Sequence, residues 1–363
     1  MKLQIIRISS PEKQTQQIEK SLQVLREGGM LCLPTDTVYG LAIDAHNKNA
    51  VERIYQLKQR SKEKPLILFP KEHTVLVHLT KKIPLCALKL ISYFWPGPLT
   101  IIFQSSTQAP RCLISEEGKI GMRIPNHPVP KRISQETNIL LATTSANLSG
   151  EVAPVEVEKL SPKIKEGVDL IIDSGKTSIG RESTVVDVTG KNPQILREGS
   201  ISGDDLEKAL DKPTNILFVC TANMCRSVMA EAILKSFLTR RNYDKVKVAS
   251  AGIHALAFFA PSGTTIQTMK KRGIDVSSYF SSPLTSEVVG SSDVIFVMEK
   301  KHQQHILQFY PEAANKIWLL KKFSRGKDEE VLDPTGACEE AYQETACELE
   351  EEIKRIMERI FEE

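Results

Sequence analysis

The chain has 363 residues, a formal net charge of +3 and ordinary fractions of hydrophobic (41%) and charged (26%) residues. This composition excludes a disordered tail, a collagen-like fibre and a disulfide-dense miniprotein. A domain usually takes roughly 100–200 residues, so the length predicts two domains. No apolar run approaches the ~18–20 residues that span a bilayer, and the first residues lack the apolar core of a signal peptide. Because the seven cysteines are odd in number and thinly spread, we expect reduced thiols and a cytoplasmic location without membrane contact.

A boundary between two domains is predicted near residues 203–214. A short polar helix is followed there by a Pro-containing break, and a new apolar strand begins at Ile216. We therefore predict domains over residues 1–210 and 214–363. The first 212 residues carry 29 basic against 24 acidic side chains, whereas the remaining residues carry 19 against 21. Neither half is basic enough for its charge alone to indicate a nucleic-acid-binding surface.

In chain order, the first half alternates short apolar strands with helices. A helix is predicted over 49–58, because Val51, Ile54 and Leu57 recur at helical spacing. Strands of this half are predicted over 30–33, 99–103, 139–142, 170–173 and 183–188, with a loop over the Trp-Pro-Gly-Pro run at 95–98. In the second half the predicted strands lie over 216–219, 246–249 and 293–298, and the last helix runs over 342–360. Strands that alternate with helices in this way predict an α/β fold for the second half.

The sharpest pattern in the second half is CTANMCRS over residues 220–227, placed between an apolar strand and a helix. Such a loop can turn its backbone N–H groups inward and form an anion site at the helix N-terminus. Arg226 offers a planar fork to phosphate oxygens, and its charge favours the thiolate of Cys220, which is then placed for in-line attack on phosphorus. Asp333, in the Asp-Pro pair far along the chain, is the candidate donor of a proton to the leaving group. A cysteine at a strand end is often only a small core residue, but the arginine six positions later favours the catalytic interpretation.

With the Ser-Ala-Gly run at 250–252 and the late Asp-Pro pair, the second half resembles the low-molecular-weight protein-tyrosine phosphatases over about 215–361. The resemblance implies a flavodoxin-like, doubly wound parallel sheet and no cofactor. It implies that Cys220 is the nucleophile, Arg226 the phosphate clamp and Asp333 the general acid. It assigns support of the phosphate loop to Thr221, Ala222, Asn223, Met224, Cys225 and Ser227.

The protein substrate of this half stays open between phosphotyrosine and phosphoarginine. The same half also resembles the protein-arginine phosphatase branch, which commonly has threonine at the position of Met224. Met224 therefore favours phosphotyrosine. Thr335 and Gly336, however, stand where many tyrosine-directed members carry aromatic residues. The resemblance also implies that Cys225 can protect Cys220 as a reversible disulfide.

Polar clusters follow the predicted strands of the first half, and no Gly-rich dinucleotide or triphosphate loop is found there. The clusters lie over 34–41, 58–60, 121–125, 143–147, 183–184 and 195–199. Together they supply a lysine, three arginines and several hydroxyls, a set that suits the triphosphate of a nucleotide and a small zwitterion. Each cluster alone is more typical of a turn or of a helix end.

Taken together and in order, PTDTVYGL, KQR, WPGPLT, MRIP, TTSANLSG, STVVD and ILREG resemble the YrdC-type threonylcarbamoyl-adenylate synthases, over about 5–210. The resemblance implies a twisted mixed-sheet α/β domain that joins L-threonine, bicarbonate and ATP into threonylcarbamoyl-adenylate and pyrophosphate, with Mg²⁺ on the phosphates. A partner transferase would then modify adenosine 37 of tRNA, and contact with tRNA or double-stranded RNA is implied as well. The implied ATP-binding residues are Lys58, Arg60, Ser145, Asn147 and Arg197, and the implied threonine-binding residues are Thr35, Arg123, Thr143 and Ser183.

Other interpretations of the same residues remain open. The first half could be an RNA-binding module without turnover, and the second half a reader of phosphorylated ligands. His302 and His305 are expected on a solvated helix face rather than in a metal pair, and no metal site is predicted. The acidic residues among 348–352 are expected on the solvated face of the last helix, and Trp95 is expected to be a packing anchor. The cysteines outside the phosphate loop are expected to be buried or idle thiols: Cys32, Cys86, Cys112, Cys338 and Cys347.

Overall fold

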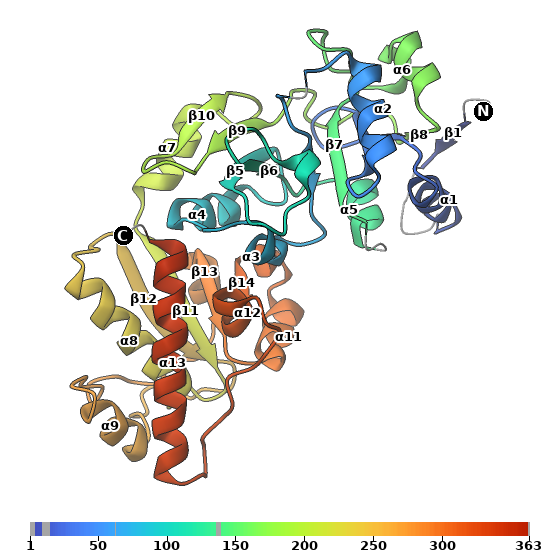
Figure 1. The fold of residues 1–363 in the computed structure, drawn as a ribbon. Coiled ribbons are helices and arrows are strands. Elements are labelled where there is room, and N and C mark those ends of the chain that lie inside the picture. Colours follow the sequence, from blue (N-terminus) through green and yellow to red (C-terminus); the bar gives the residue numbers. More distant parts are fainter. Residues whose placement is uncertain (1–3, 9–14, 62, 136–138, 362–363) are drawn as a thin grey trace. The chain divides into compact units, whose positions relative to one another are not determined.

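The chain forms two compact units in the computed structural model, which describes residues 4–8, 15–61, 63–135 and 139–361 (Figure 1). The first unit comprises Met1–Lys81 and Phe94–Leu206, and the second comprises Lys82–Tyr93 and Glu207–Glu363. Residues 1–3 and 9 of the start, for which no signal peptide is predicted, lie outside the described residues. Among the described residues, no helix is both long and apolar enough to cross a bilayer. Each unit is built around a β-sheet of its own.

The sheet of the first unit is mixed and contains ten strands over the described residues (Figure 1). Its strands are β1 (Gln4–Arg7), β2 (Leu31–Leu33), β3 (Gly40–Asp44), β4 (Ile67–Phe69), β5 (Leu99–Gln104), β6 (Lys119–Met122), β7 (Leu141–Ser145), β8 (Leu170–Asp173), β9 (Thr184–Asp187) and β10 (Gln194–Arg197). Their order in the sheet is β1-β8-β2-β3-β7-β4-β6-β5-β9-β10. Parallel pairs such as β1 with β8 occur beside antiparallel pairs such as β2 with β3. The mixed-sheet α/β fold expected for the first half is thereby confirmed.

All strands predicted in the first half are present, with bounds shifted by a few residues. The sequence pattern does not predict β1, β3, β4, β6 or β10. β3 and β6 are short, mostly buried and contain glycine, so they show no alternation of apolar and polar residues. β10 is exposed along its whole length and therefore shows none either. Trp95 is buried as expected, and its indole N–H donates to the Leu99 carbonyl (2.7 Å).

The helices of the first unit pack on its sheet and fix the ends of the neighbouring strands. They are α1 (Thr15–Arg26), α2 (Lys48–Lys58), α3 (Leu76–Leu79), α5 (Pro128–Gln135), α6 (Pro162–Gly167) and the start of α7 (Gly203–Asp211). One apolar core joins Ile18 and Leu22 of α1 and Ile133 of α5 to the sheet. The Asn47 side chain caps α2 by accepting the Ala50 N–H (3.0 Å). α2 ends at Lys58, which places the predicted Lys-Gln-Arg cluster where the helix gives way to a loop.

The sheet of the second unit is parallel and has the order β12-β11-β13-β14. Its strands are β11 (Thr214–Cys220), β12 (Val246–Gly252), β13 (Val294–Val297) and β14 (Ile317–Leu319). Its helices are α4 (Leu85–Phe94), α8 (Arg226–Arg240), α9 (Gly263–Lys270), α10 (Ser286–Ser291), α11 (Lys300–Phe309), α12 (Leu320–Arg325) and α13 (Glu339–Ile360). α8 and α13 lie against each other, and α11 packs on β13 and β14 (Figure 1). The doubly wound parallel-sheet fold is confirmed, and its parallel strands bring their carboxyl ends to one edge.

Residues 82–93 belong to the second unit although they lie between β4 and β5 in the sequence. Their helix α4 buries Ala87, Leu88, Leu90 and Ile91. The Ile83 N–H donates to the Arg359 carbonyl near the end of α13 (3.0 Å). The sequence pattern does not indicate the place of this segment, because its place depends on contacts with residues far along the chain.

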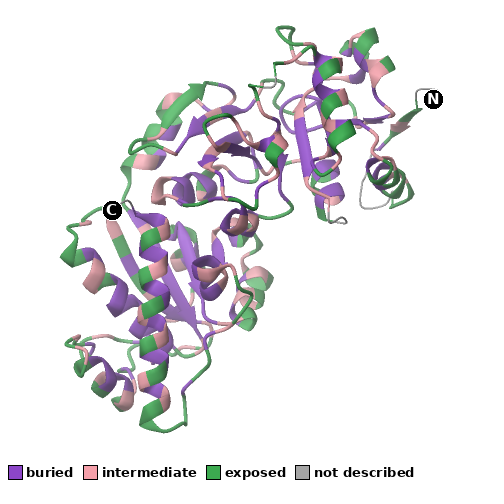
Figure 2. Cartoon of the chain, viewed as in Figure 1, coloured by how far each residue is buried: buried purple, intermediate pink, exposed green. Residues whose placement is uncertain are grey.

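The last helix, α13, is amphipathic as expected, and its inner face is buried along the sheet of the second unit (Figure 2). One expectation for it is wrong: Glu352 is 0% exposed, although the acidic residues of this stretch were assigned to the solvated face. Its carboxylate accepts hydrogen bonds from the Ser324 hydroxyl and from Arg355 (3.2 Å), and it is paired with Arg325. The residue lies on the inner side of the helix because α12 presents a hydroxyl and a guanidinium to it there. The periodic pattern of α13 does not reveal those partners.

We expect Glu352→Ala to lower the unfolding free energy of the second unit by about 2–3 kcal/mol, because it leaves Ser324 and two arginines without their shared acceptor. Glu350→Ala is the matched control, since its side chain is 39% exposed and should contribute less than about 0.5 kcal/mol. Amide hydrogen exchange of β11 and β13 in increasing urea measures the difference. Equal midpoints for the two variants would contradict the structural role of Glu352.

Candidate active sites

The phosphate loop over 220–226 lies at the carboxyl end of β11, where the chain turns into α8. Cys220 is paired in the sheet with Gly252, the last residue of β12. A Cβ atom on Gly252 would lie 2.7 Å from the Thr221 carbonyl oxygen and 2.8 Å from the Asn223 backbone nitrogen. Only glycine therefore allows the loop to curl this close to β12, which accounts for the Ser-Ala-Gly run that accompanies the loop in the sequence.

Asn223 holds the shape of the phosphate loop. Its backbone is left-handed (φ 55°), and its side-chain amide donates to the hydroxyls of Ser227 (2.8 Å) and Ser250 (2.7 Å). Its side-chain carbonyl accepts the Ser282 N–H (2.8 Å). The Ser227 hydroxyl lies 3.0 Å from the Cys220 sulfur. These contacts fix the loop on three sides and place a hydrogen-bonding group beside the thiol.

The Arg226 side chain is 1% exposed and is held between two carboxylates. Its Nη1 donates to Glu299 Oε1 (2.6 Å) and to the Val331 carbonyl (2.8 Å), and its Nη2 donates to Asp333 Oδ2 (2.5 Å). Its Nε is buried and has no hydrogen-bond partner among the described residues. The guanidinium thus retains donors for an anion in the loop, and the arrangement brings Cys220, Arg226 and Asp333 to one place.

Asp333 is an acceptor when no ligand is bound. Burial raises its pKa, but the hydrogen bond from the Thr335 hydroxyl (2.8 Å) and the charge of Arg226 outweigh burial and hold the pKa below its usual value. A bound phosphate dianion would share the Arg226 charge and weaken its hold on Asp333. The pKa of Asp333 would then rise, which is the direction that proton donation to a leaving group requires.

Glu299 belongs to this site although it is not among the residues predicted from the sequence, and His302 belongs to it against the expectation of a solvated position, which is wrong. His302 is 0% exposed rather than on a solvated face. Its Nδ1 accepts the Glu299 N–H (3.1 Å), and its Nε2 lies 3.0 Å from the Thr221 hydroxyl. Burial and then the charge of Arg226 lower the pKa of His302 to about 4, so the ring is neutral near pH 7. Glu299 follows β13, the parallel strand beside β11. A polar residue at the carboxyl end of such a strand is the sequence signal that could have indicated Glu299.

A small pocket of about 100 Å³ opens above the phosphate loop. Its lining residues are Cys220, Ala222, Met224, Cys225, Arg226, Ser262, Asp333, Thr335 and Tyr342. Cys225 lies 3.5 Å from the Ser262 hydroxyl and 3.9 Å from the Tyr342 hydroxyl, measured from its sulfur. Thr221 does not line the pocket, since its hydroxyl is directed to His302. The pocket therefore has an anion-binding floor and a polar wall of hydroxyl groups.

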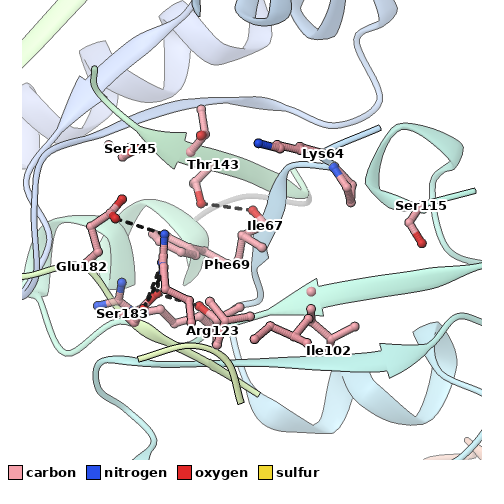
Figure 3. Close-up of a pocket in the computed structure, with 18 of the residues that line it drawn as sticks. Lys64, Ile67, Phe69, Ile102, Ser115, Arg123, Thr143, Ser145, Glu182 and Ser183 are labelled. Atoms are coloured by element: carbon pink, nitrogen blue, oxygen red, sulfur yellow. Dashed lines mark hydrogen bonds and ion pairs between the residues drawn. The ribbon is translucent and has the colours of Figure 1, made fainter. Parts of the chain in front are cut away.

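The first unit contains a larger cavity, of about 750 Å³, with its wall formed by several strands of the mixed sheet (Figure 3). Seven of the nine ligand-binding residues expected in this half line it: Thr35, Arg60, Arg123, Thr143, Ser145, Ser183 and Arg197. Figure 3 shows Glu182 and Ser183 on one side and Lys64 and Ser115 on the other. Residues far apart in the sequence are thus brought around one space.

Arg123 is the most buried cation of the cavity, at 4% exposure. Its Nη2 donates to Asp36 (2.5 Å), its Nη1 to the Thr37 hydroxyl (2.8 Å) and its Nε to the Gly97 carbonyl (2.9 Å). These bonds use three of the five N–H donors of a guanidinium. The other two are available to a carboxylate in the cavity.

Arg197 of β10 is bound to the segment that precedes β9. Its guanidinium donates to the Ser183 carbonyl (2.9 Å) and hydroxyl (3.2 Å) and to Glu182 (3.1 Å). A Cβ on Gly199 would lie 2.2 Å from the Glu182 carbonyl oxygen, so this turn also depends on glycine for its close approach. Ser183 in turn lies 3.0 Å from the Thr100 hydroxyl. The strand end and the turn together form one side of the cavity.

Lys58 and Asn147 do not line the cavity. The Lys58 ammonium donates to the carbonyl groups of Ser145 and Asn147, and the Ser145 hydroxyl donates to the Asn147 side chain (2.6 Å). Burial and the nearby charge of Arg60 lower the pKa of Lys58 to about 8. In this state Lys58 shapes the loop after β7 rather than facing a ligand.

Several cavity residues escape the sequence analysis. Lys64 lines the cavity beyond the Lys-Gln-Arg cluster, and Arg60 donates to its carbonyl (2.9 Å). The carboxylates of the lining are Glu63, Glu116, Glu117, Glu182 and Asp187. Asp187 is paired with Lys119 (3.0 Å), and the other cations of the lining are Lys64, Arg60, Arg123 and Arg197. The cationic cluster at 58–60 could have indicated Lys64, because Lys64 lies only four residues after Arg60 in the sequence.

Two family models match the chain. The model described as telomere recombination, which groups the Sua5, YciO and YrdC proteins, matches residues 23–199. The model described as low molecular weight phosphotyrosine protein phosphatase matches residues 215–363. The two matched ranges do not overlap, so each half is similar to a different family.

Two curated relatives are similar to the first half. The threonylcarbamoyl-AMP synthase of Pyrococcus abyssi is 36% identical over 186 residues, which are 51% of this chain and 55% of that protein. The putative threonylcarbamoyl-AMP synthase of Mycobacterium tuberculosis H37Rv is 31% identical over 211 residues, 58% of this chain and 96% of that protein. The chain spans little more than half the length of its first curated relatives. A solved double variant of Pyrococcus abyssi Sua5 is similar with a TM-score of 0.54 and 26% identity, over 75% of this chain and 89% of that one.

We expect Gly252→Ala to reduce the affinity of the second unit for vanadate or phosphate about tenfold to a hundredfold. The new Cβ would meet only backbone atoms of the phosphate loop, so the loop must shift, and shifts of about 1 Å at a reacting centre have effects of this size. Gly263→Ala is the matched control, because a Cβ there would have nothing within 4 Å. Isothermal titration calorimetry on the full chain measures both, and an unchanged affinity for Gly252→Ala would refute the close approach.

Proposed function

We propose two enzymatic activities for this chain, which belongs over its first half to the Sua5, YciO and YrdC family and over its second half to the low-molecular-weight phosphotyrosine protein phosphatase family. The first activity joins L-threonine, bicarbonate and ATP into threonylcarbamoyl-AMP and pyrophosphate. The second removes a phosphoryl group from a protein side chain by way of a phosphocysteine. The observation that carries the first is the convergence of Arg123, Arg197 and Ser183 on one cavity. The observation that carries the second is the Cys220–Arg226–Asp333 arrangement.

The cavity of the first unit suits a nucleotide together with a small zwitterion. Its volume of about 750 Å³ is within the range of ligand pockets, roughly 300–1,000 Å³. Arg123 offers two N–H donors deep in the cavity, where they can hold the carboxylate of threonine. Arg60 and Arg197 lie nearer to solvent and can hold phosphate oxygens, with Ser145 as a further donor. Thr35, Thr143 and Ser183 supply hydroxyls for the amino acid, and the wall needs no nucleophile because positioning of the reactants provides most of the catalysis.

Lys58 and Asn147 keep a proposed role in ATP binding through the loop that they hold. The Lys58 ammonium is bound to backbone carbonyls next to Ser145, and a triphosphate is the stronger partner for a cation. We infer that Lys58 exchanges these carbonyls for phosphate oxygens when ATP binds. Its low pKa, about 8, would rise beside a phosphate.

Mg²⁺ would enter with ATP rather than in a cage of protein ligands. Among the described residues, no group of three or more His, Cys, Asp and Glu side chains is arranged to hold a metal ion. Mg²⁺ commonly keeps several waters and binds substrate phosphates, whose charge it neutralises. The residues of this chain are therefore assigned to the phosphates and to threonine, and none is assigned to the ion.

In the second unit the reaction is proposed to run in two displacements. The Cys220 sulfur attacks phosphorus, the bond from phosphorus to the leaving oxygen or nitrogen breaks, and Asp333 gives that atom a proton. The Asp333 carboxylate then accepts a proton from water, which attacks the phosphocysteine and releases inorganic phosphate. Arg226 and the loop N–H groups bind the phosphoryl oxygens throughout. Asn223 and Ser227 keep the loop in place, and no cofactor is required.

Phosphoarginine is the favoured substrate of this pocket, and phosphotyrosine is the second candidate. The wall carries the hydroxyls of Ser262, Thr335 and Tyr342 and the carboxylate of Asp333. These groups accept hydrogen bonds from the N–H donors of a guanidinium, whereas a phenyl ring offers none. Met224 favours the ring of phosphotyrosine, because it is a large apolar side chain of the lining.

We place the limits of the two catalytic parts at residues 210 and 214, and the chain in the cytoplasm. A transferase that carries the threonylcarbamoyl group to tRNA adenosine 37 would be the partner of the first activity. We also propose that the first half contacts tRNA or other double-stranded RNA. An RNA-binding module without turnover is the alternative that the assay below distinguishes.

We expect the full chain to release pyrophosphate from ATP only when both threonine and bicarbonate are present. Arg123→Lys should raise the KM for threonine about tenfold or more and leave the KM for ATP within about twofold, since lysine lacks the planar fork. Arg26→Lys, on the exposed face of α1, is the control. Pyrophosphate release is measured with a coupled phosphate assay. Salt-sensitive binding of tRNA without any pyrophosphate release would instead indicate the RNA-binding module.

We expect Cys220→Ser to abolish phosphatase turnover and to retain oxyanion binding, because the loop and Arg226 remain in place. Phosphopeptides that differ only in carrying phosphoarginine or phosphotyrosine measure the substrate class by kcat/KM. Cys347→Ser, at an exposed cysteine that does not line the pocket, is the control and should act like the wild type. Turnover that survives Cys220→Ser would refute the mechanism, and a wild type that binds phosphopeptides without turnover would be a phospho-ligand reader.

A further inference from the structure

We propose that an aromatic surface beside the phosphate pocket binds apolar side chains of the phosphorylated protein, a proposal that rests on the phosphatase function above. The surface consists of Leu256, Phe258, Phe259 and Phe280, and we call it the aromatic rim. Their exposed fractions are 70%, 84%, 53% and 60%. None of the four lines the phosphate pocket. Single exposed apolar residues are ordinary, but several in one place commonly mark an interaction surface.

The aromatic rim is one surface because two loop segments are bonded to each other through Ser281. The Phe258 N–H donates to the Ser281 carbonyl (2.9 Å), and the Ser281 N–H donates to the Phe259 carbonyl (2.8 Å). The Ser281 hydroxyl donates to the Leu256 carbonyl. Phe280 directly precedes this serine. The four apolar side chains are therefore carried by a single hydrogen-bonded unit.

The same unit is tied to the phosphate loop at three points. The His254 N–H donates to the Thr221 carbonyl (2.9 Å), and the Ser262 N–H donates to the Met224 carbonyl (3.2 Å). The Ser282 N–H donates to the Asn223 side chain (2.8 Å). The aromatic rim therefore keeps a fixed position next to the loop that would hold the phosphoryl group.

The backbone of Phe258 supports a functional interpretation of the aromatic rim. Its φ is +68°, in the left-handed region that large side chains avoid. The side chain is the most exposed of the four, so its own burial does not offset that strain. Strained residues of this kind gather at binding and catalytic sites.

The size of the pocket points to the occupant of the aromatic rim. A pocket of about 100 Å³ receives the phosphoryl group and its immediate attachment, so the residues flanking a phosphorylated side chain must lie outside it. Beside the pocket those residues meet the four exposed apolar side chains of the aromatic rim. We infer that leucine or phenylalanine next to the phosphorylated residue favours turnover.

The test compares the wild-type full chain with the double variant Phe258→Asn and Phe280→Ser. Asparagine accepts the left-handed backbone, so the variant retains the local fold. The probes are a phosphopeptide with leucine on both sides of the phosphorylated residue, the same peptide with serine in place of these leucines, and p-nitrophenyl phosphate. We expect the wild type to favour the leucine-flanked peptide by about tenfold in kcat/KM, and the variant to lose this preference while p-nitrophenyl phosphate turnover stays within about twofold. Val152→Ser, at a 94% exposed position of the first unit, should keep the preference.

The aromatic rim is refuted as a substrate surface if the wild type treats both peptides alike, or if the variant loses all three activities equally. It is also refuted if the substitutions convert a dimer to a monomer in sedimentation, or abolish binding to phosphatidylcholine vesicles, without changing the peptide preference. A wild type inactive on p-nitrophenyl phosphate and on both phosphopeptides would overturn the phosphatase function itself. In that case binding of the two peptides to Cys220→Ser still decides for or against the rim.

Discussion

Both candidate sites depend on a buried guanidinium that is held by carboxylates. Arginine stays charged at any physiological pH, so its burial is tolerated only where an opposite charge and further acceptors surround it. Arg123 meets this condition through Asp36, and Arg226 through Glu299 and Asp333. In each case some N–H donors are left over, and they face a cavity. The structure around each of the two residues shields these N–H donors from water, orients them and leaves them without a protein acceptor, so that they can bind an anion.

The local parts of the sites follow from the sequence, while their long-range parts do not. Cys220, Asn223 and Arg226 belong to one loop. The strand before it, the loop itself and the helix after it are consecutive in the sequence, so all three can be predicted from local patterns. Glu299 joins Arg226 only because β13 lies beside β11, a neighbour relation that no local pattern states. His302 shows the same limit, since its helical spacing predicts exposure whereas α11 turns it toward the phosphate loop.

Burial also separates what the motifs indicate from what the side chains contact. Lys58 belongs to a cationic cluster, yet its ammonium is directed into the loop after β7 and away from the cavity. Glu352 lies in an acidic run, yet three side chains of the second unit surround it. Periodicity locates the helices and most strands because it reflects apolar burial. It carries no information about a polar side chain whose partners come from another element.

The edge position of β10 has a consequence for the larger cavity. This strand pairs only with β9 in the described sheet, its register shifts between Ile195 and Arg197, and every one of its residues is exposed. Edge strands with few buried contacts have the lowest free energy of local opening in a sheet. The wall that carries Leu196 is therefore expected to open more readily than the central strands, and the hydrogen bonds of Arg197 to Glu182 and Ser183 oppose that opening. A ligand that bridges this wall to the buried Arg123 would order the wall, and the entropy lost in that ordering would reduce its affinity.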